Sequence, residues 1–267
     1  MSQADVLFVS HGGGPLPLLG DPGHREMVQC LTAMNGELRK PDAILVVSAH
    51  WEATIPTVTT AANPSLFYDY YGFPEESYHI QYPCPGEPEL AQQVMDVLTV
   101  AGIPAKSDGQ RGLDHGVFVP LKLLYPEADI PTIQLSLKKG LDAAEHIRIG
   151  EALRGLNYDN LLIIGSGFSF HNMRAFFTPE TPEIRQMNQA FAEWLNQTCG
   201  DTALPESERA QRLIEWEKAP AARFNHPREE HLIPLMVCYG LAGRASSKIY
   251  DLSIVNKRSA MYRWAPE

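Results

Sequence analysis

The sequence predicts an α/β protein: a single domain in which helices cover both faces of a central, mostly buried mixed sheet. Several short segments are apolar without the alternation that marks a strand with one wet face, so both of their faces are expected to be buried. Segments with helical spacing of apolar residues separate them. No segment reads as a linker, so the 267 residues, 44% of them hydrophobic, are expected to form one domain, 1–267.

Most of the expected strands are short segments dominated by apolar residues. The expected strands are 4–10, 42–48, 56–61, 131–137, 161–165 and 247–252. The expected helices carry apolar residues three or four positions apart, as Met27, Leu31 and Met34 do in the first of them. They are 22–39, 88–101, 117–125, 143–156, 183–198, 206–217 and 229–243. Residues 64–86, rich in aromatic residues and proline, are expected to form a long irregular loop.

Composition excludes several classes of partner. The net charge of -10 argues against nucleic acid, because phosphate binding needs a basic surface. No apolar run approaches the ~20 residues of a membrane span, and the first residues lack the basic flank and apolar core of a signal peptide. The four cysteines are scattered without a CxxC motif, which favours free thiols in a reducing compartment. We therefore expect a cytoplasmic protein with no nucleic-acid or membrane partner; the oligomeric state is left open.

The nine histidines are the most informative feature. Four of them follow an apolar segment or lie beside glycine: His11, His50, His115 and His171. Because the carboxyl ends of strands line the ligand crevice in open α/β sheets, we expect His11, His50 and His171 to converge there. His226, at the expected start of a helix, is a fifth candidate. Clustered imidazoles repel one another if charged and lose hydration if neutral, whereas a divalent metal ion uses their lone pairs, so the cluster indicates a metal site.

The remaining histidines and the glycines have more ordinary interpretations. His24, His79 and His146 are expected to be surface residues or polar residues with satisfied hydrogen bonds. Glycines 12–14 allow a sharp turn and leave room beside a metal ion. A phosphate cradle is the alternative, here or at 165–167, but residues 11–15 lack the lysine and the serine or threonine of a phosphate loop, and 165–167 is a short, unspecific pattern.

Six short blocks of sequence, running in order from residue 8 to about residue 235, resemble the signature segments of class III extradiol ring-cleavage dioxygenases. The nearest subgroup is that of the 4,5-DOPA extradiol dioxygenase-like proteins. The blocks are Ser10 to Pro15, Ser48 to Glu52, Tyr82 to Gly86 with Glu89 to Ala91, Gly112 to Gly116, Gly165 to Asn172, and His226 to Leu232.

The resemblance implies a non-haem metal enzyme that opens a catechol ring beside the diol with O2. Fe(II) is the metal of the active members, and Zn(II) has also been seen bound in the subgroup. By similarity, His11, His50 and His226 would be the metal ligands. His171 matches the family's acid–base histidine, which is sometimes counted as a fourth ligand, and His115 matches a second active-site histidine that contacts the substrate.

One departure affects the third ligand. Many members of the wider class use two histidines and one glutamate, so Glu229 and Glu230 leave the identity of the third ligand open.

Neutral histidines would leave the charge of the ion uncompensated, which favours binding of catechol as an anion. A base must still take a proton from the ring hydroxyl, and an imidazole does this near neutral pH.

For several other residues near these blocks, the sequence allows two roles each. The aromatic residues of 67–78 either cover a planar substrate or pack the loop onto the body, and Trp51 is equally ambiguous. Arg228 either meets a substrate carboxylate or makes a surface ion pair with a glutamate. Asp114 either orients His115 or caps a helix.

Two other functions are compatible with a histidine cluster. A zinc hydrolase would need a carboxylate base such as Glu52, Glu229 or Glu230, but no HExxH signature is present. A non-catalytic metal-binding relative would have no use for the acid–base residues His115 and His171.

Overall fold

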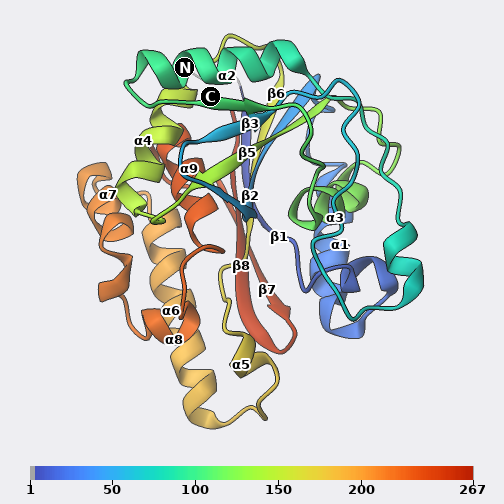
Figure 1. Ribbon diagram of the computed structural model, residues 1–267. Helices are drawn as coiled ribbons and strands as arrows, with labels where there is room; N and C mark the ends of the chain where they lie inside the picture. Colours follow the sequence, from blue (N-terminus) through green and yellow to red (C-terminus); the bar gives the residue numbers. More distant parts are fainter. Residues whose placement is uncertain (1–3, 267) are drawn as a thin grey trace.

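The computed structural model describes residues 4–266 and has one eight-stranded mixed sheet at its centre (Figure 1). The strand order is β4-β3-β5-β2-β6-β1-β8-β7. The strands are β1 (Asp5–Ser10), β2 (Ala43–Ala53), β3 (Thr57–Thr59), β4 (Lys106–Asp108), β5 (Thr132–Lys138), β6 (Leu161–Gly167), β7 (Lys248–Ile254) and β8 (Lys257–Trp264).

Helices connect most of the strands. The α-helices are α1 (Arg25–Met34), α2 (Pro88–Val100), α3 (His115–Leu124), α4 (Ala143–Leu153), α5 (Met173–Phe176), α6 (Pro182–Gly200), α7 (Glu206–Ile214), α8 (Ala222–Asn225) and α9 (Ile233–Ala242). Short 3-10 helices occur at Leu16–Leu19, Pro22–His24, Glu75–His79 and Trp216–Lys218.

The four inner strands β5, β2, β6 and β1 run parallel to one another. Strand β8 is antiparallel to β1, and β3 is antiparallel to β5, so the sheet is mixed as predicted. Since neighbouring parallel strands end at the same edge, the residues that follow β1, β2 and β6 are brought together there.

Apolar side chains fill both faces of the sheet. On one face Leu7 and Val9 of β1 belong to a core that also contains residues of α1 and α3. On the other face Val6 and Phe8 belong to a core built with α2, α4, α6 and α9. Figure 1 shows these two groups of helices on opposite sides of the strands. The prediction of a sheet buried on both faces is therefore confirmed.

Most differences from the sequence prediction lie at the ends of elements. The first predicted helix, 22–39, is α-helical only over α1, because a 3-10 turn precedes it. The last helix begins at Ile233 rather than at 229, since the preceding residues form turns. Strands β4 and β8 were not predicted. Residues 64–86 are irregular as expected, apart from the 3-10 helix Glu75–His79 and an isolated bridge between Leu66 and Leu113.

Two expectations from composition concern the described residues. The four cysteines are free, as predicted. Within residues 4–266, no helix has the length and apolar character needed to cross a membrane. The expectation about a signal peptide rests partly on residues 1–3, which lie outside the described residues.

Candidate metal centre

His11 follows β1 directly and begins a sharp glycine turn. Gly12 has a φ of +75°, and a Cβ there would lie 2.6 Å from Pro17 Cγ and 2.7 Å from His24 Cδ2. His24 braces the turn: its Nε2 accepts from the backbone N–H of Gly13 at 3.0 Å, and its Nδ1 lies 2.7 Å from Asp21. The glycine turn therefore packs against protein groups, and His24 is a buried histidine with satisfied hydrogen bonds, as expected.

His50 lies on an irregular part of β2. Val47 of β2 pairs with Leu135 of β5, and Glu52 pairs with Leu137, so β2 carries extra residues between these two pairs. Such a bulge bends the strand and redirects its side chains, and bulges are common next to active sites. The bulge explains why His50, a residue inside a strand, reaches the same place as His11.

His231 comes from the turn that precedes α9. Its carbonyl oxygen accepts from the backbone N–H of Phe168, just beyond β6, at 2.9 Å. A Cβ on Gly167 would lie 2.1 Å from that oxygen, so only glycine permits the close approach. Gly167 thus brings the segment before α9 against the end of β6, and does not form a phosphate cradle.

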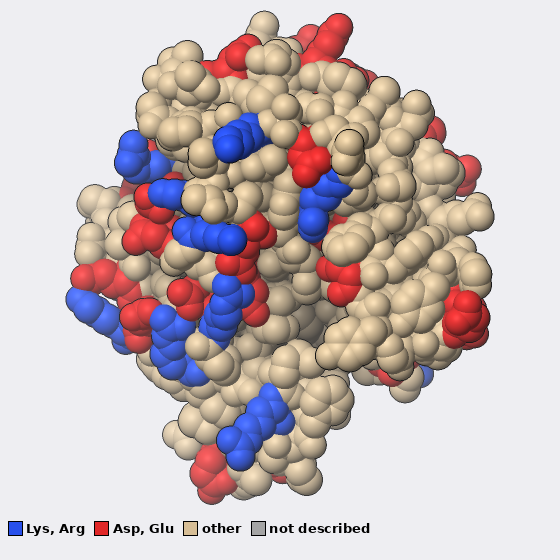
Figure 2. Space-filling model, in the orientation of Figure 1, with Lys and Arg blue, Asp and Glu red and all other residues tan. Residues whose placement is uncertain are grey.

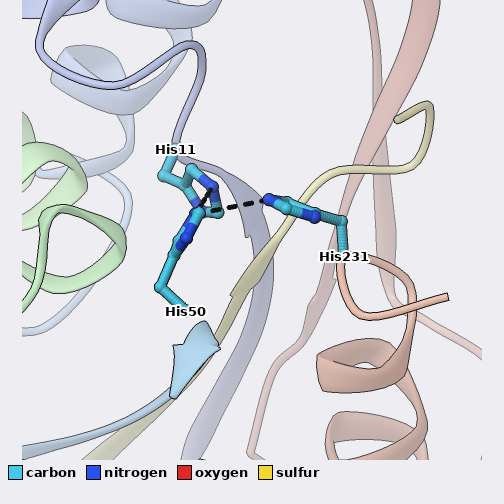
Figure 3. A group of neighbouring side chains, drawn as sticks. All are labelled: His11, His50 and His231. Atoms are coloured by element: carbon cyan, nitrogen blue, oxygen red, sulfur yellow. Dashed lines mark hydrogen bonds between the residues drawn. The ribbon is translucent and has the colours of Figure 1, made fainter. Parts of the chain in front are cut away.

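These three histidines point toward one another from three separate segments (Figure 3). His50 Nε2 lies 2.9 Å from His11 Nε2 and 3.3 Å from His231 Nε2. All three side chains belong to a group whose ligand atoms lie within 4.8 Å of one another. Three nitrogen lone pairs at these distances would repel one another, whereas a shared cation would bind all three.

The outer nitrogens indicate which tautomer each ring adopts. The Ser166 hydroxyl donates its proton to the carbonyl oxygen of Gly116, so it must accept from His11 Nδ1–H, which lies 3.0 Å away. Carboxylates lie beside the other two outer nitrogens: Asp69 is 3.6 Å from His50 Nδ1, and Glu230 is 3.1 Å from His231 Nδ1. Each Nε2 is then a bare lone pair, the form a metal ligand requires.

The electrostatics agree with neutral rings. Burial, followed by the repulsion of neighbouring histidines, holds the pKa of His11 and of His50 well below the usual value. Burial also lowers the pKa of His231 to about 3. Neutral imidazoles at ordinary pH fit the donor set of a transition metal or zinc.

His226, the third ligand expected from the sequence, lies elsewhere. Its ring is fully buried between Phe191 and Trp216, with centroid distances of 5.4 and 6.1 Å. Its Nε2–H donates to the carbonyl oxygen of Ser169 at 2.9 Å. Among the described residues, the groups close enough to share an ion include His231 and not His226. The structure thus corrects the prediction: the short turn after α8 directs His226 into the apolar core.

His115 and His171 flank the three converging rings of His11, His50 and His231. His115 lies beside His50, with ring centroids 4.0 Å apart. His171 stacks on His231 with a centroid distance of 3.4 Å and an interplanar angle of 15°. The structure therefore brings His11, His50, His115 and His171 together, and His231 takes the place expected of His226.

Two carboxylates contact these histidines, and sequence reasoning missed the role of both. Asp69 accepts from the Nδ1–H of His115 at 2.8 Å and from the backbone N–H of the same residue at 3.0 Å. Burial opposes ionisation of Asp69, but the hydrogen bonds from His115 outweigh it and lower the pKa of the carboxyl. Burial likewise opposes ionisation of Glu230, yet hydrogen bonds from His171 and His231 hold its pKa below the usual range. The charge of an ion here would be partly compensated, contrary to the sequence-based expectation.

Asp114 has neither of the roles considered for its side chain. It is the N-cap residue of α3, but its carboxylate makes no capping hydrogen bond and accepts instead from Ser48 Oγ at 2.7 Å and from Gln134. The residue that orients His115 is Asp69, which lies in the irregular loop far from it in sequence. In the sequence, Asp69 is distinguished only as an acidic residue among aromatic ones, which does not indicate a contact with His115.

The aromatic loop mostly packs onto the body. Tyr70 is buried, and its ring lies 6.4 Å from that of Phe118 in α3. Tyr71, by contrast, is 92% exposed. Trp51 is buried under the guanidinium of Arg111, which lies 4.6 Å from its ring centroid.

The rim of the site carries a salt bridge. Arg228 Nη2 lies 2.6 and 2.8 Å from the two carboxylate oxygens of Glu52, so the surface ion pair considered for Arg228 is the one observed. The space-filling view shows this face of the molecule hollowed near its centre, with most charged residues on one side of the hollow (Figure 2).

Of the other histidines considered, His79 is exposed and pairs with Glu75. His146 is buried, but its Nδ1–H donates to the carbonyl oxygen of Asp142, and its Nε2 accepts from the backbone N–H of Lys138. Both match the ordinary interpretation.

An α/β fold that gathers five histidines at the carboxyl edge of its parallel strands defines a candidate non-haem metal enzyme. Comparison with known proteins makes this specific. The family model described as "Catalytic LigB subunit of aromatic ring-opening dioxygenase" matches residues 17–261. The chain therefore belongs to this family of class III extradiol dioxygenases, and it is an extradiol ring-cleavage enzyme that acts on a small aromatic molecule and O2.

Individual relatives with similar sequences are also named as dioxygenases. A dioxygenase, tasH, of Hapsidospora irregularis is 42% identical over 259 residues, covering 91% of this chain and 79% of the relative. The 4,5-DOPA dioxygenase extradiol of Beta vulgaris is 37% identical, covering 91% and 88%, and that of Escherichia coli is 32% identical, covering 90% and 85%. A crystal structure of an uncharacterized protein from Escherichia coli K12 matches with a TM-score of 0.74 at 27% identity, covering 97% of this chain and 99% of that one.

Proposed function

We propose that His11, His50 and His231 bind Fe(II), and that the enzyme cleaves the ring of a catechol beside its two hydroxyl groups. The observation that supports this most directly is the convergence of three Nε2 atoms, with the Ser166 hydroxyl or a carboxylate beside the Nδ1 atom of each ring. Three protein ligands on one face leave positions for both catechol oxygens and O2. A bound Fe(II) would supply the electron transfer between catecholate and O2 that the reaction needs.

His171 is the proposed acid–base residue. Its ring is stacked on that of His231, one of the three proposed ligands. Its Nδ1 is 3.4 Å from Glu230, which leaves Nε2 to take the proton of a ring hydroxyl and later return it. Its role as a fourth ligand remains the alternative proposal.

His115 is proposed to contact the substrate from the other side. Asp69 fixes its Nδ1–H, so its Nε2 faces away from that carboxylate. A fixed imidazole of this kind can hydrogen-bond a catechol oxygen and stabilise charge that develops there. The two histidines would then hold the substrate between them.

The substrate class follows from the relatives. Several of them are named 4,5-DOPA dioxygenase extradiol, which supports a dihydroxyphenylalanine-like catechol as the first compound to test. The relative from Hapsidospora irregularis carries no substrate in its name, so a panel of catechols is needed. A hydrolytic function has less support, because Glu52, one of its carboxylate bases, is engaged by Arg228.

The test is reconstitution of metal-free protein. Apo-protein is loaded anaerobically with Fe(II) or, as a control, with Zn(II), mixed with dihydroxyphenylalanine or another catechol, and exposed to air. We expect oxygen uptake and a yellow ring-opened product with Fe(II) only, because zinc has no redox chemistry. Absence of uptake across the panel would refute the proposal.

A further inference from the structure

We propose that Asp69 and Glu230 are a pair of positioning carboxylates, each of which fixes one metal-facing histidine and one neighbouring histidine through their outer nitrogens. Asp69 lies between His50 and His115, with distances of 3.6 and 2.8 Å to their Nδ1 atoms. Glu230 lies between His231 and His171, at 3.1 and 3.4 Å. The inference rests on the proposed function, because it assigns these residues a role toward the metal that the three histidines hold.

The geometry places both carboxylates behind the rings. In His231, the nitrogen that faces Glu230 is Nδ1, whereas the nitrogen that faces His50 is Nε2. A carboxylate in this position accepts the Nδ1 proton and leaves the lone pair of Nε2 for the ion. Outer carboxylates of this kind fix ring orientation and raise the basicity of the ligand. His11 differs from the other two, since its outer partner is the neutral hydroxyl of Ser166.

Each carboxylate is itself held in place. Asp69 belongs to the irregular loop, which is anchored on both sides of it by tyrosine hydroxyls: Tyr68 donates to the carbonyl of Ile80 at 2.5 Å, and Tyr70 donates to that of Ser77 at 2.6 Å. The loop backbone is also tied to the body, because the N–H of Phe67 donates to the carbonyl of Leu113. The loop therefore carries a carboxylate into the site in a fixed position.

Glu230 is held in place by Arg228, which lies at the rim of the site. Arg228 Nη1 lies 3.4 Å from Glu230 Oε2, and the same guanidinium binds both oxygens of Glu52. Glu52 follows His50 closely on β2, so the salt bridge connects two of the three segments that supply the proposed ligands, the one with His50 and the one with His231. This explains why Arg228 makes an ion pair rather than remaining free for a substrate.

Both carboxylates act in the same direction on charge. Three neutral imidazoles contribute no charge, so the two carboxylates would compensate part of the charge of a divalent ion, and an incoming catecholate would meet a smaller excess of positive charge. A direct bond between Glu230 and the ion is the competing role, and it is distinguished by the size of the effect on metal affinity. Loss of an outer partner costs about 10–100-fold in affinity, and loss of a ligand costs more.

The test measures metal binding without catalysis. The affinity of apo-protein for Zn(II) is determined by competition with a chromophoric chelator for the wild type, Asp69→Asn and Glu230→Gln. We expect each substitution to weaken binding by about 10–100-fold. The matched controls are Glu75→Gln, on the same loop as Asp69, and Glu229→Gln, next to Glu230; both carboxylates pair elsewhere, and binding should be unchanged.

A second readout reports the tautomer itself. In zinc-loaded protein labelled with nitrogen-15 at histidine, long-range proton–nitrogen spectra should show His50 and His231 protonated at Nδ1 in the wild type. In the variant that lacks its carboxylate, that proton should exchange faster with water. If Asp69→Asn does not fold, Asp69→Glu keeps the charge but moves it by one methylene, and its affinity should fall measurably below that of the wild type.

The outcomes separate this inference from the proposed function. Wild-type binding that depends on His11, His50 and His231, together with unchanged affinity in both carboxylate variants, would overturn the positioning role alone. Loss of affinity in Glu230→Gln as complete as in His231→Ala would make Glu230 a ligand and would also overturn it. A wild type that binds no metal would overturn the proposed function first.

Discussion

The proposal that His231, and not His226, binds the metal gives the sharpest prediction, because the two residues lie five positions apart and have opposite expected phenotypes. His231→Ala should abolish tight metal binding, with a loss that exceeds the ~10–100-fold effect of an outer partner. His226→Ala should leave metal affinity unchanged and instead destabilise the fold.

The magnitude for His226 follows from its surroundings. The ring is fully buried between Phe191 and Trp216, and its Nε2–H satisfies the carbonyl oxygen of Ser169. Removing a buried ring leaves a cavity, and the carbonyl loses its partner, so we expect a cost of about 3 kcal/mol. At about 2–4 °C per kcal/mol for a protein of this size, the unfolding midpoint should fall by roughly 6–12 °C.

The assay pairs metal analysis with thermal unfolding. Purified variants are stripped, reloaded with Zn(II), and measured for bound metal and for unfolding midpoint. His226→Gln serves as a control, because its side-chain amide can still donate to Ser169 and should recover most of the stability. Full metal occupancy in His231→Ala together with metal loss in His226→Gln would refute this reasoning and restore the assignment expected from the sequence.

Three further predictions follow from the same structure. His171→Ala should keep its metal but lose about 10²–10⁴-fold in turnover, as expected for a proton-transfer residue; collapse of the metal content would make it a ligand instead. Gly12→Ala should lower the free energy of unfolding by more than Gly20→Ala does, because both glycines have positive φ but only the former meets neighbouring atoms; equal effects would contradict the packing described. Burial lowers the pKa of His146, so below about pH 6.5 the unfolded chain binds more protons than the folded protein. The free energy of unfolding of the wild type should therefore lose its advantage over that of His146→Gln as the pH falls from 8 to 5. A difference that stays constant with pH in urea unfolding would contradict this prediction.

Much of the fold could be predicted from apolar patterning. The inner strands are apolar throughout, and that pattern identified β1, β2, β5 and β6 with small errors at their ends. Strand β8 was missed because it mixes lysine, arginine and serine with apolar residues, a pattern with no clear period. Its identity as a strand depends on pairing with β1 and β7, which is a property of the assembled sheet.

The site was predicted where a histidine follows an apolar run or lies beside glycine. His11, His50, His115 and His171 do so, and all four reach the cluster. His226 and His231 lie in one turn-rich segment, and which of them faces the cluster depends on the backbone path after α8, which residue spacing does not define. Asp69 could not be found from the sequence, because its contact with His115 depends on how an irregular loop folds back onto α3.

The sequence separation of the three metal-facing histidines has a consequence for synthesis of the protein. His50 precedes His231 by 181 residues, and His11 lies earlier still. A growing polypeptide that has not yet reached residue 231 lacks one of the three proposed ligands, so the full proposed donor set forms only after that residue has been added. Acquisition of metal would then mark the molecules whose first and last segments have met correctly.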